Sequence, residues 1–441
     1  MESVRKFLNK STLFAVLILP VFLTHLRGIA DGLISYIAIC FVIYSFINKQ
    51  WDWGKQNWVI IAFLWWGWIL LCTIPFGLFQ YNIMMIQALV LIRFIFFAAA
   101  LQVWVLTDEK YRRWLSYVLI ACAIYIILNM LCQLITGYNI LGAPRYFDGT
   151  LTGPYHHPRA AGPLARLLLP ITLSLSIYCI CRLKGWRGNL VALFIILFAT
   201  LMMAFAGQRM PFILFVFGIV VSLYWLRPLR TIVLSMLICI PLILGATSFL
   251  SPKSYHHLVT LFIHQMAHFS SDNYGLIYTR AMIMGLSNPW TGLGYDAYRH
   301  FCANPIYFHG LSFWGIAIGH GDGKGAEICL PHPHNHYIEM FVNAGIPGLI
   351  LFCYMVFLWW VNLVKGLTSK LLSLKDAVKN SWRVGLFAAV LVHEWPFAAG
   401  GSFGNLPLGG WFFLLLGLGL SYSWDYGNHK AALKVHNGIG S

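Results

Sequence analysis

The chain has 441 residues, of which 59% are hydrophobic, 16% are aromatic and only 10% are charged, and its mean hydropathy is +0.72. This composition is typical of a polytopic membrane protein and excludes an ordinary soluble globular protein. The formal net charge of +16 does not predict a nucleic-acid partner, because the basic residues are spread over short segments between apolar runs and form no basic helix or basic domain.

Apolar runs of roughly 20 residues recur along the chain, which is the length that a helix needs to cross a bilayer. The fold class is therefore predicted to be an all-α polytopic membrane protein, with residues 1–441 forming a single integral membrane domain. About twelve transmembrane helices are expected, near residues 12–26, 33–48, 58–77, 83–107, 115–136, 163–181, 189–206, 211–226, 231–250, 336–364, 384–400 and 411–424.

The distribution of Lys and Arg predicts the orientation of these spans. With both termini on the cytoplasmic side, twenty basic residues fall in inside segments and nine in outside segments, and Arg93 falls within the fourth span. Cytoplasmic segments of membrane proteins are enriched in Lys and Arg. Two outside segments exceed the usual connection length. They are a first periplasmic loop at 137–162 and a large periplasmic loop at 251–335, which is expected to be a small subdomain.

The large loop is rich in histidine, because ten of the chain's sixteen histidines lie between His256 and His336. Within this loop, the spacing of apolar residues over Tyr278–Leu286 predicts a helix. The stretch Asn288–Tyr295, which contains Pro and two Gly, predicts a turn.

Four residues are candidates for two structural pairs. Cys302 and Cys329 both lie in the large loop, where an oxidising periplasm would permit a disulfide. The sequence does not decide between a disulfide and two free thiols, since it does not give the distance between the two Cα atoms.

Arg93 and Glu394 both fall inside predicted spans, where charges are costly and usually pair. The preferred interpretation is that they pair with each other, and the alternative is contact with a lipid carrier.

The end of the large loop is the strongest candidate site. His332-Pro333-His334-Asn335-His336 leads into an apolar helix, and Asn335 is suited to the N-cap of that helix. His334 would then stand at a helix N-terminus, where the backbone dipole favours anions. Histidine has an unperturbed pKa that suits proton transfer near neutrality. The alternative interpretation is a polar helix start that happens to be rich in histidine.

The residues close to His334 in the sequence have several possible roles. A zinc site built from His332, His334 and His336 is conceivable, but no cysteine or carboxylate lies at matching spacing, so no metal is predicted. Asn335 would cap the helix or orient the base. Glu339 lies three residues after His336, on the same helix face, and could pair with it.

Four arginines outside the membrane are candidates for binding phosphate. Arg209 lies where the seventh span ends and the eighth begins, Arg280 lies in the large loop, and Arg145 and Arg159 lie in the first loop. An arginine fork binds phosphate oxygens in bidentate fashion and stays charged at any relevant pH. The alternatives are lipid headgroup contact and local salt bridges, although few acidic residues are predicted on this side.

At these residues the chain resembles a known family. His334-Asn335, followed by nine residues and then Gly345-Ile346-Pro347-Gly348, is similar to the signature of the O-antigen ligase and polymerase superfamily of bacterial envelope glycosyltransferases. Gly207-Gln208-Arg209 resembles the small-residue/Arg element of that family. Tyr278-Thr279-Arg280, ten residues before Trp290, resembles its loop arginine followed by a Gly-x-Gly turn. The resemblance covers roughly residues 140–365. Met210-Pro211 departs from the family, which more often has small residues there.

The resemblance implies a C-type glycosyltransferase fold in the bacterial inner membrane, with a periplasmic active site. Such enzymes transfer a glycan from an undecaprenyl pyrophosphate donor, invert the anomeric centre and need no metal or other cofactor. His334 would be the general base, and Arg209 and Arg280 would bind the pyrophosphate. Arg159, Arg145, Asn335 and His336 would contribute further substrate contacts.

Several function classes remain. The preferred function is that of an O-antigen ligase in lipopolysaccharide biosynthesis, which joins a finished polysaccharide to a sugar hydroxyl of the lipid A–core oligosaccharide. The alternative is an O-antigen polymerase, which uses a lipid-linked repeat as the acceptor. Transfer to a protein hydroxyl is a further option within the superfamily. A lipid-linked glycan flippase is disfavoured, because a transporter would place polar residues at its midplane, whereas here they are predicted on one membrane face.

Overall fold

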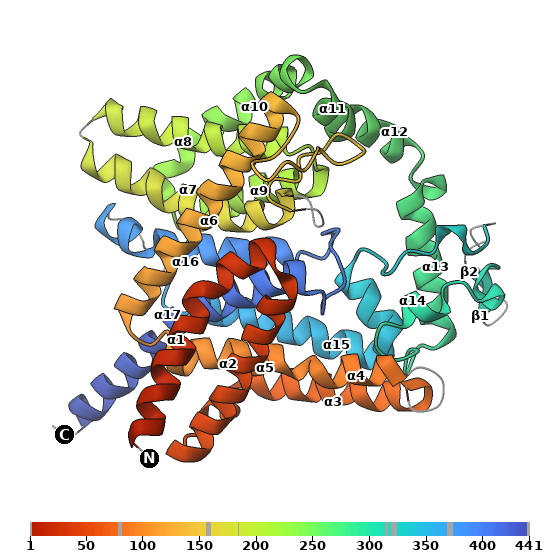
Figure 1. The fold of residues 1–441 in the computed structure, drawn as a ribbon, viewed down its shortest axis with the longest axis horizontal. Helices are drawn as coiled ribbons and strands as arrows, with labels where there is room; N and C mark the ends of the chain where they lie inside the picture. The colour runs from red at the N-terminus through yellow and green to blue at the C-terminus, as the bar shows by residue number, and fades with distance from the viewer. Residues whose placement is uncertain are drawn as a thin grey trace.

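The computed structural model describes residues 2–77, 82–155, 160–183, 185–313, 316–318, 324–367 and 374–438. Long helices lie side by side and make up most of the molecule, which confirms an all-α polytopic fold. The two ends of the chain lie on one side, and the segment from α13 through α14 to β1 and β2 lies on the opposite side (Figure 1).

The main helices are α1 (Glu2–His25), α2 (Arg27–Asn48), α3 (Asn57–Gly77), α4 (Asn82–Val90), α5 (Ile92–Ala100), α6 (Glu109–Thr136), α7 (Ala161–Arg182), α8 (Trp186–Phe205), α9 (Arg209–Ser222), α10 (Arg230–Leu250), α13 (Asn273–Ser287), α15 (His336–Val364), α16 (Leu374–His393) and α17 (Leu406–Gly438). Shorter helices and turns are η1 (Asp52–Lys55), η2 (Leu101–Val105), η3 (Arg227–Leu229), α11 (Pro252–Tyr255), η4 (His256–Thr260), α12 (Leu261–Ala267), η5 (Phe269–Ser271), α14 (Ala297–Phe301), η6 (Pro305–Tyr307) and η7 (Ala326–Ile328). The strands β1 (Leu311–Phe313) and β2 (Ile316–Ile318) pair in antiparallel fashion.

Within the described residues, ten helices are long and apolar enough to cross a membrane. Every predicted span coincides at least in part with a helix, but two differ from the expectation of twelve long apolar spans. Helix α9 has only 14 residues. Helix α16 ends at His393, so the eleventh span, predicted at 384–400, is too long at its C-terminal end. The cause is local, because Trp395-Pro396 follows and a residue before proline disfavours the helical conformation.

The segment 251–335 contains the predicted helix and turn. Helix α13 covers Tyr278–Leu286, and the stretch after it is non-helical, with Gly292 and Gly294 at positive φ. Cys302 and Cys329 form a disulfide, with Cα atoms 5.8 Å apart. The glycine-rich stretch at 319–325 lies mostly outside the described residues.

The interior of the bundle is closely packed around α7, which is buried along most of its N-terminal half and packs against α8, α9 and α16. Gly385 of α16 meets Pro170 of α7 so closely that an added Cβ would lie 2.2 Å from the Pro170 Cα. Small residues permit this close approach between membrane helices. The position of α16 on α7 is therefore fixed by backbone contact.

The predicted Arg93–Glu394 pair is wrong. The Arg93 guanidinium binds both carboxylate oxygens of Asp31 of α2, at 2.6 and 3.1 Å, in bidentate fashion. Glu394 instead lies just beyond α16 and accepts a hydrogen bond from His336. The sequence did not indicate this pair, because Asp31 falls in the short connection between the predicted spans 12–26 and 33–48.

Reversal of either charge of the Arg93–Asp31 pair is expected to destabilise the fold. Arg93→Asp or Asp31→Arg leaves a half-buried charge without its partner, which costs about 1–3 kcal/mol. The double exchange should restore most of the loss in thermal midpoint measured in detergent. The exposed pair Asp52–Lys55 is the control, and its reversal should change the midpoint little. Failure of the double exchange to rescue either single variant would contradict this pairing.

Candidate active site at the start of α15

Helix α15 is interrupted at the glycine of its Gly-x-x-Gly sequence. Gly345 has φ +64° and ψ −165°, a conformation that is strongly disfavoured for any residue with a Cβ. Pro347 follows, and its ring would clash with the carbonyl of Asn343 in an uninterrupted helix. The interruption therefore leaves the carbonyls before Gly345 without their intrahelical partners.

The turn after α13 supplies the missing donors. The N–H groups of Leu293 and Gly294 donate to the carbonyls of Val342 and Asn343, both at 2.9 Å, and Ile346 donates back to the Pro289 carbonyl at 2.7 Å. The approach is so close that a Cβ on Gly292 would lie 2.5 Å from the Ala344 nitrogen. The Gly-rich turn and the Gly-x-x-Gly helix break are therefore complementary parts of one contact.

The N-terminus of α15 is capped as predicted. The Asn335 side-chain oxygen accepts from the backbone N–H groups of Tyr337 and Ile338, at 3.0 and 3.1 Å. Its amide nitrogen donates to the carbonyls of Pro396 and Ala398, at 2.7 and 3.3 Å. Asn335 therefore caps the helix and also binds the segment after α16, residues 394–405, which is called the 394–405 loop below.

His334 lies immediately before this cap in a strained backbone conformation, with φ +56°. Its carbonyl accepts from the Gly400 N–H at 2.9 Å, and its Nδ1 lies 3.2 Å from the Gly400 carbonyl. A carbonyl can only accept, so Nδ1 carries the proton and the lone pair of the neutral ring is on Nε2. Strain of this kind is held at a position by its surroundings and is frequent at functional sites.

His332 and Tyr274 lie beside His334. The His332 and His334 rings meet edge to face, with centroids 4.4 Å apart, and the Tyr274 ring is 5.5 Å away. Burial, assisted by the charges of nearby His334, His336 and Arg299, lowers the pKa of His332 to about 3. His332 is therefore neutral at physiological pH and places no positive charge next to the candidate base.

Several side chains of α15 hold the 394–405 loop in place. His336 donates through Nδ1 to the Glu394 carboxylate and through Nε2 to the Gly401 carbonyl, both at 3.0 Å. Glu339 accepts from the Ser402 hydroxyl and from the Phe403 N–H. The predicted Glu339–His336 pair is thus replaced by bonds from each residue to this loop.

A buried polar cluster continues from Glu394 into the bundle. Arg166 of α7 donates from Nε to Nδ1 of His393, whose Nε2 lies 3.6 Å from the Glu394 carboxylate. His336, His393 and Glu394 lie close enough together to hold a metal ion. His336 is hydrogen-bonded to one Glu394 oxygen, Oε2, and the other, Oε1, has no hydrogen-bond partner among the described residues.

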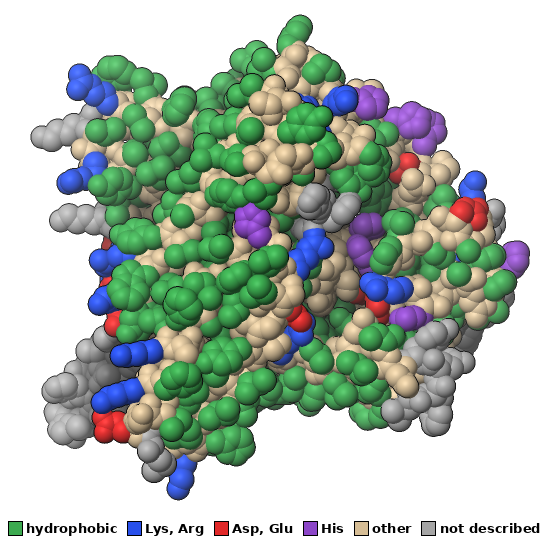
Figure 2. Space-filling view, in the orientation of Figure 1, with side chains coloured by type: hydrophobic (Ala, Val, Ile, Leu, Met, Phe, Trp, Pro, Cys, Tyr) green, Lys and Arg blue, Asp and Glu red, His purple; other side chains and the backbone are tan. Residues whose placement is uncertain are grey.

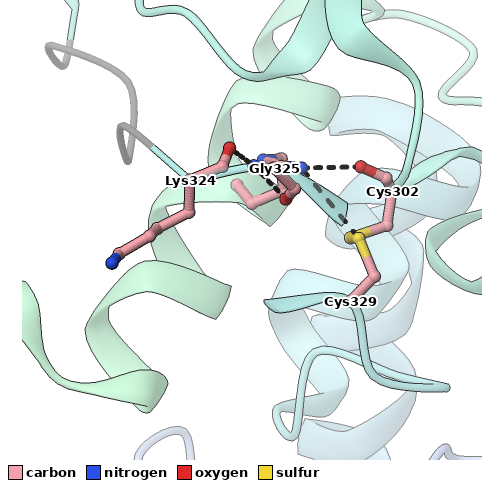
Figure 3. Close-up of a disulfide and its surroundings, with 5 residues drawn as sticks. Cys302, Lys324, Gly325 and Cys329 are labelled. Atoms are coloured by element: carbon pink, nitrogen blue, oxygen red, sulfur yellow. Dashed lines mark hydrogen bonds between the residues drawn. A yellow bond between two sulfur atoms is a disulfide. The ribbon is translucent and has the colours of Figure 1, made fainter. Parts of the chain in front are cut away.

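Arg280 is fully buried, although it was predicted to bind phosphate. Its guanidinium donates to the carbonyls of Cys302, Lys324 and Gly325 at 2.7–3.2 Å and lies 4.3 Å from the Phe308 ring centroid. Figure 3 shows these three carbonyls beside the disulfide. In this conformation Arg280 holds the segment around the disulfide, and a phosphate contact by Arg280 stays a prediction.

The other predicted arginines lie in different surroundings. Arg209 is the first residue of α9, half-buried, with its guanidinium carbon 5.9 Å from the Phe262 ring. Arg145 donates to the carbonyls of Gln133 and Leu134. It also contacts the Ser251 hydroxyl, which joins the first loop to the start of α11. Arg159 lies outside the described residues.

The structure thus brings together His334, Asn335 and His336 at the start of α15 and gives each a defined partner in the 394–405 loop. It adds Glu394, His393 and Arg166, which the sequence analysis did not place at the site. In Figure 2, histidine and charged side chains gather near the middle of a face that is otherwise largely hydrophobic.

These features define a polytopic helical membrane protein with a histidine site at the capped start of an interrupted helix. Residues 192–353 match the family model described as O-antigen ligase. The matched segment runs from α8 to α15 and contains Arg209, Arg280 and His334. This match supports the resemblance of residues 192–353 to the O-antigen ligase and polymerase superfamily. No curated protein matches the chain.

Substitution Glu394→Gln is expected to loosen the 394–405 loop. The buried His336 would lose its counter-charge, and loss of one partner from a buried pair costs about 3–5 kcal/mol. We expect a lower thermal midpoint and faster backbone hydrogen exchange at residues 394–405. The matched control is Glu327→Gln, which alters an exposed carboxylate. Unchanged exchange in Glu394→Gln would show that this ion pair does not hold the loop.

Proposed function

We propose that this chain is an O-antigen ligase. It transfers a polysaccharide from undecaprenyl pyrophosphate to a sugar hydroxyl of the lipid A–core oligosaccharide, at the periplasmic face of the bacterial inner membrane. The family match supports a glycosyltransferase that acts on O-antigen. The observation that carries the proposal is the geometry of His334, whose Nδ1–H is bonded to the Gly400 carbonyl so that the basic lone pair is on Nε2.

In the proposed reaction His334 is the general base. Nε2 takes the proton from the acceptor hydroxyl as the hydroxyl oxygen attacks the anomeric carbon. The bond between that carbon and the pyrophosphate oxygen breaks, the anomeric centre inverts, and undecaprenyl pyrophosphate leaves with the electron pair. A positioned base of this kind contributes about 100- to 10,000-fold to the rate.

The leaving pyrophosphate develops negative charge, which arginine side chains can neutralise. Arg209 is proposed as a direct ligand, because it is half-buried at the start of a helix. Arg280 would reach the pyrophosphate by exchanging its carbonyl partners for phosphate oxygens. Arg145 and Arg159 are proposed as further contacts.

The proposed orientation follows from charge and chemistry. In Figure 2 Lys and Arg side chains gather at the end of the molecule where the chain termini lie, as expected for cytoplasmic segments. The segments 137–162 and 251–335 would then face the periplasm, where the Cys302–Cys329 disulfide is stable.

An O-antigen polymerase is the second candidate, because the same base and arginines would serve an acceptor that is itself a lipid-linked repeat. The preference for the ligase rests on the compact histidine signature and the long segment that precedes it. The two enzymes differ in what accumulates when the base is lost.

Substitution His334→Ala is expected to abolish the lipopolysaccharide ladder of a strain that depends on this chain. Activity should fall at least about 100-fold, because the general base is lost. Blots should reveal long polymer still attached to the undecaprenyl carrier. His309→Ala, at an exposed histidine of the same segment, is the control and should leave the ladder intact. Core carrying a single repeat would identify a polymerase instead. A normal ladder with normal protein level would rule out His334 as the base.

Transfer by the purified protein is expected to proceed at full rate in EDTA, because arginines can neutralise the leaving pyrophosphate without a metal. The measurement is transfer of lipid-linked polymer to lipopolysaccharide that carries core but no polymer. A rate that drops in EDTA and returns with a divalent cation would contradict metal independence and direct attention to the His336, His393 and Glu394 group.

A further inference from the structure

A cavity of about 380 Å³ lies beside the candidate active site. Three parts of the chain line it: the junction of α4 and α5, the start of α14, and the end of the 394–405 loop. Polar lining residues include Gln87, Arg93, Asp296, Arg299, Ser402 and Asn405. We propose that this cavity binds the saccharide whose hydroxyl group attacks the donor, so that it is the acceptor subsite. This inference rests on the proposed glycosyl transfer and names the place of its second substrate.

The charges of the cavity favour an uncharged saccharide over a phosphate. Arg93 is paired with Asp31, and Arg299 with Asp296 at 3.1 Å. A phosphate has only acceptor oxygens. It would compete with both carboxylates for these guanidinium groups. A sugar hydroxyl both donates and accepts, so carboxylate, amide and guanidinium groups can all serve it.

Two polar groups of the lining have no hydrogen-bond partner among the described residues. They are the side-chain oxygen of Gln87, which accepts, and the Nε–H of Arg93, which donates. Buried polar groups of folded proteins are nearly always hydrogen-bonded. One acceptor and one donor on neighbouring helices match the two hydrogen-bonding capacities of a single hydroxyl. A hydroxylated ligand would satisfy both groups.

The cavity and His334 share one short stretch of backbone. Gly400 is bonded to His334, while Ser402 and Gly404 line the cavity. Consecutive Cα atoms are about 3.8 Å apart, so Ser402 lies within about 8 Å of Gly400. That separation is comparable to the size of one or two sugar rings. A glycan seated in the cavity can therefore extend a hydroxyl toward the candidate base.

The acceptor is inferred to reach the cavity from the bilayer. Ile86 and Val90 of α4 line the cavity and are 55% and 39% exposed. Exposed apolar side chains on a membrane helix are the surface that lipid covers. A saccharide carried on a lipid would thus find an apolar rim for the lipid and polar groups for the sugar.

The test compares cavity variants in binding and in kinetics. Val90→Trp fills the cavity, Asn405→Ala and Arg299→Gln each remove polar contacts, and Leu89→Trp is the matched control outside the lining. The acceptor probe is lipopolysaccharide that carries core but no polymer, and lipid A without core is the comparison. We expect each cavity variant to weaken binding of the core-bearing lipid and raise its KM about tenfold or more. Thermal midpoint and donor KM should match those of Leu89→Trp in all three variants, and lipid A binding should match it in Asn405→Ala and Arg299→Gln.

The other outcomes overturn the proposal. Unchanged acceptor binding in all three variants would exclude the cavity as the acceptor subsite. Equal loss of lipid A binding would show that the cavity recognises the lipid or its phosphates and not the saccharide. A raised donor KM would assign it to the donor, and failure of the unaltered protein to bind core-bearing lipid would also refute it. Binding that behaves as expected, in a protein that transfers no glycan, would refute the proposed function and leave the saccharide site standing.

Discussion

The rest of the site depends on the hydrogen bonds between α15, at its interruption near Gly345, and the turn after α13. A membrane helix cannot leave carbonyls without partners in a region with little water, and Gly345 and Pro347 interrupt α15 there. The N–H groups of Leu293 and Gly294 donate hydrogen bonds to the carbonyls that the interruption leaves without helical partners. The extramembrane segment is thereby joined to the bundle at one defined register. This contact fixes where the first turn of α15, and with it His334, lies.

The 394–405 loop forms the second half of the site. It follows α16, which ends at His393 shortly before Pro396. Asn335, the N-cap of α15, and His336 and Glu339 in the first turns of α15 bind it. Phe403 secures its far end, with its ring packed against those of Trp65, Phe352 and Phe413. This one short loop thus accepts hydrogen bonds from the N-cap residue of α15, orients the candidate base and lines a cavity. Such a loop acts as part of a rigid scaffold, which suits a group whose position must be accurate.

Local signals in the sequence were sufficient for much of the architecture. Hydropathy located the spans, Asn335 predicted the cap, and apolar spacing over Tyr278–Leu286 predicted α13. Pairing of distant charges could not be predicted, because it depends on which helices are neighbours. Arg93 was therefore assigned to Glu394 instead of Asp31. The end of α16 was misplaced because hydropathy outweighed the proline signal at Pro396. Burial of Arg280 was also beyond reach, because the sequence does not indicate which carbonyls surround a guanidinium.

The disulfide has a consequence for how the chain matures. Arg280 donates to the carbonyl of Cys302 and to those of Lys324 and Gly325, close to Cys329 in the chain. A buried guanidinium needs these acceptors to offset its loss of hydration. The disulfide joins the same two segments of the chain that carry these carbonyls. Closure of the disulfide and burial of the charge therefore favour each other, and both hold residues 302 and 324–329 against α13.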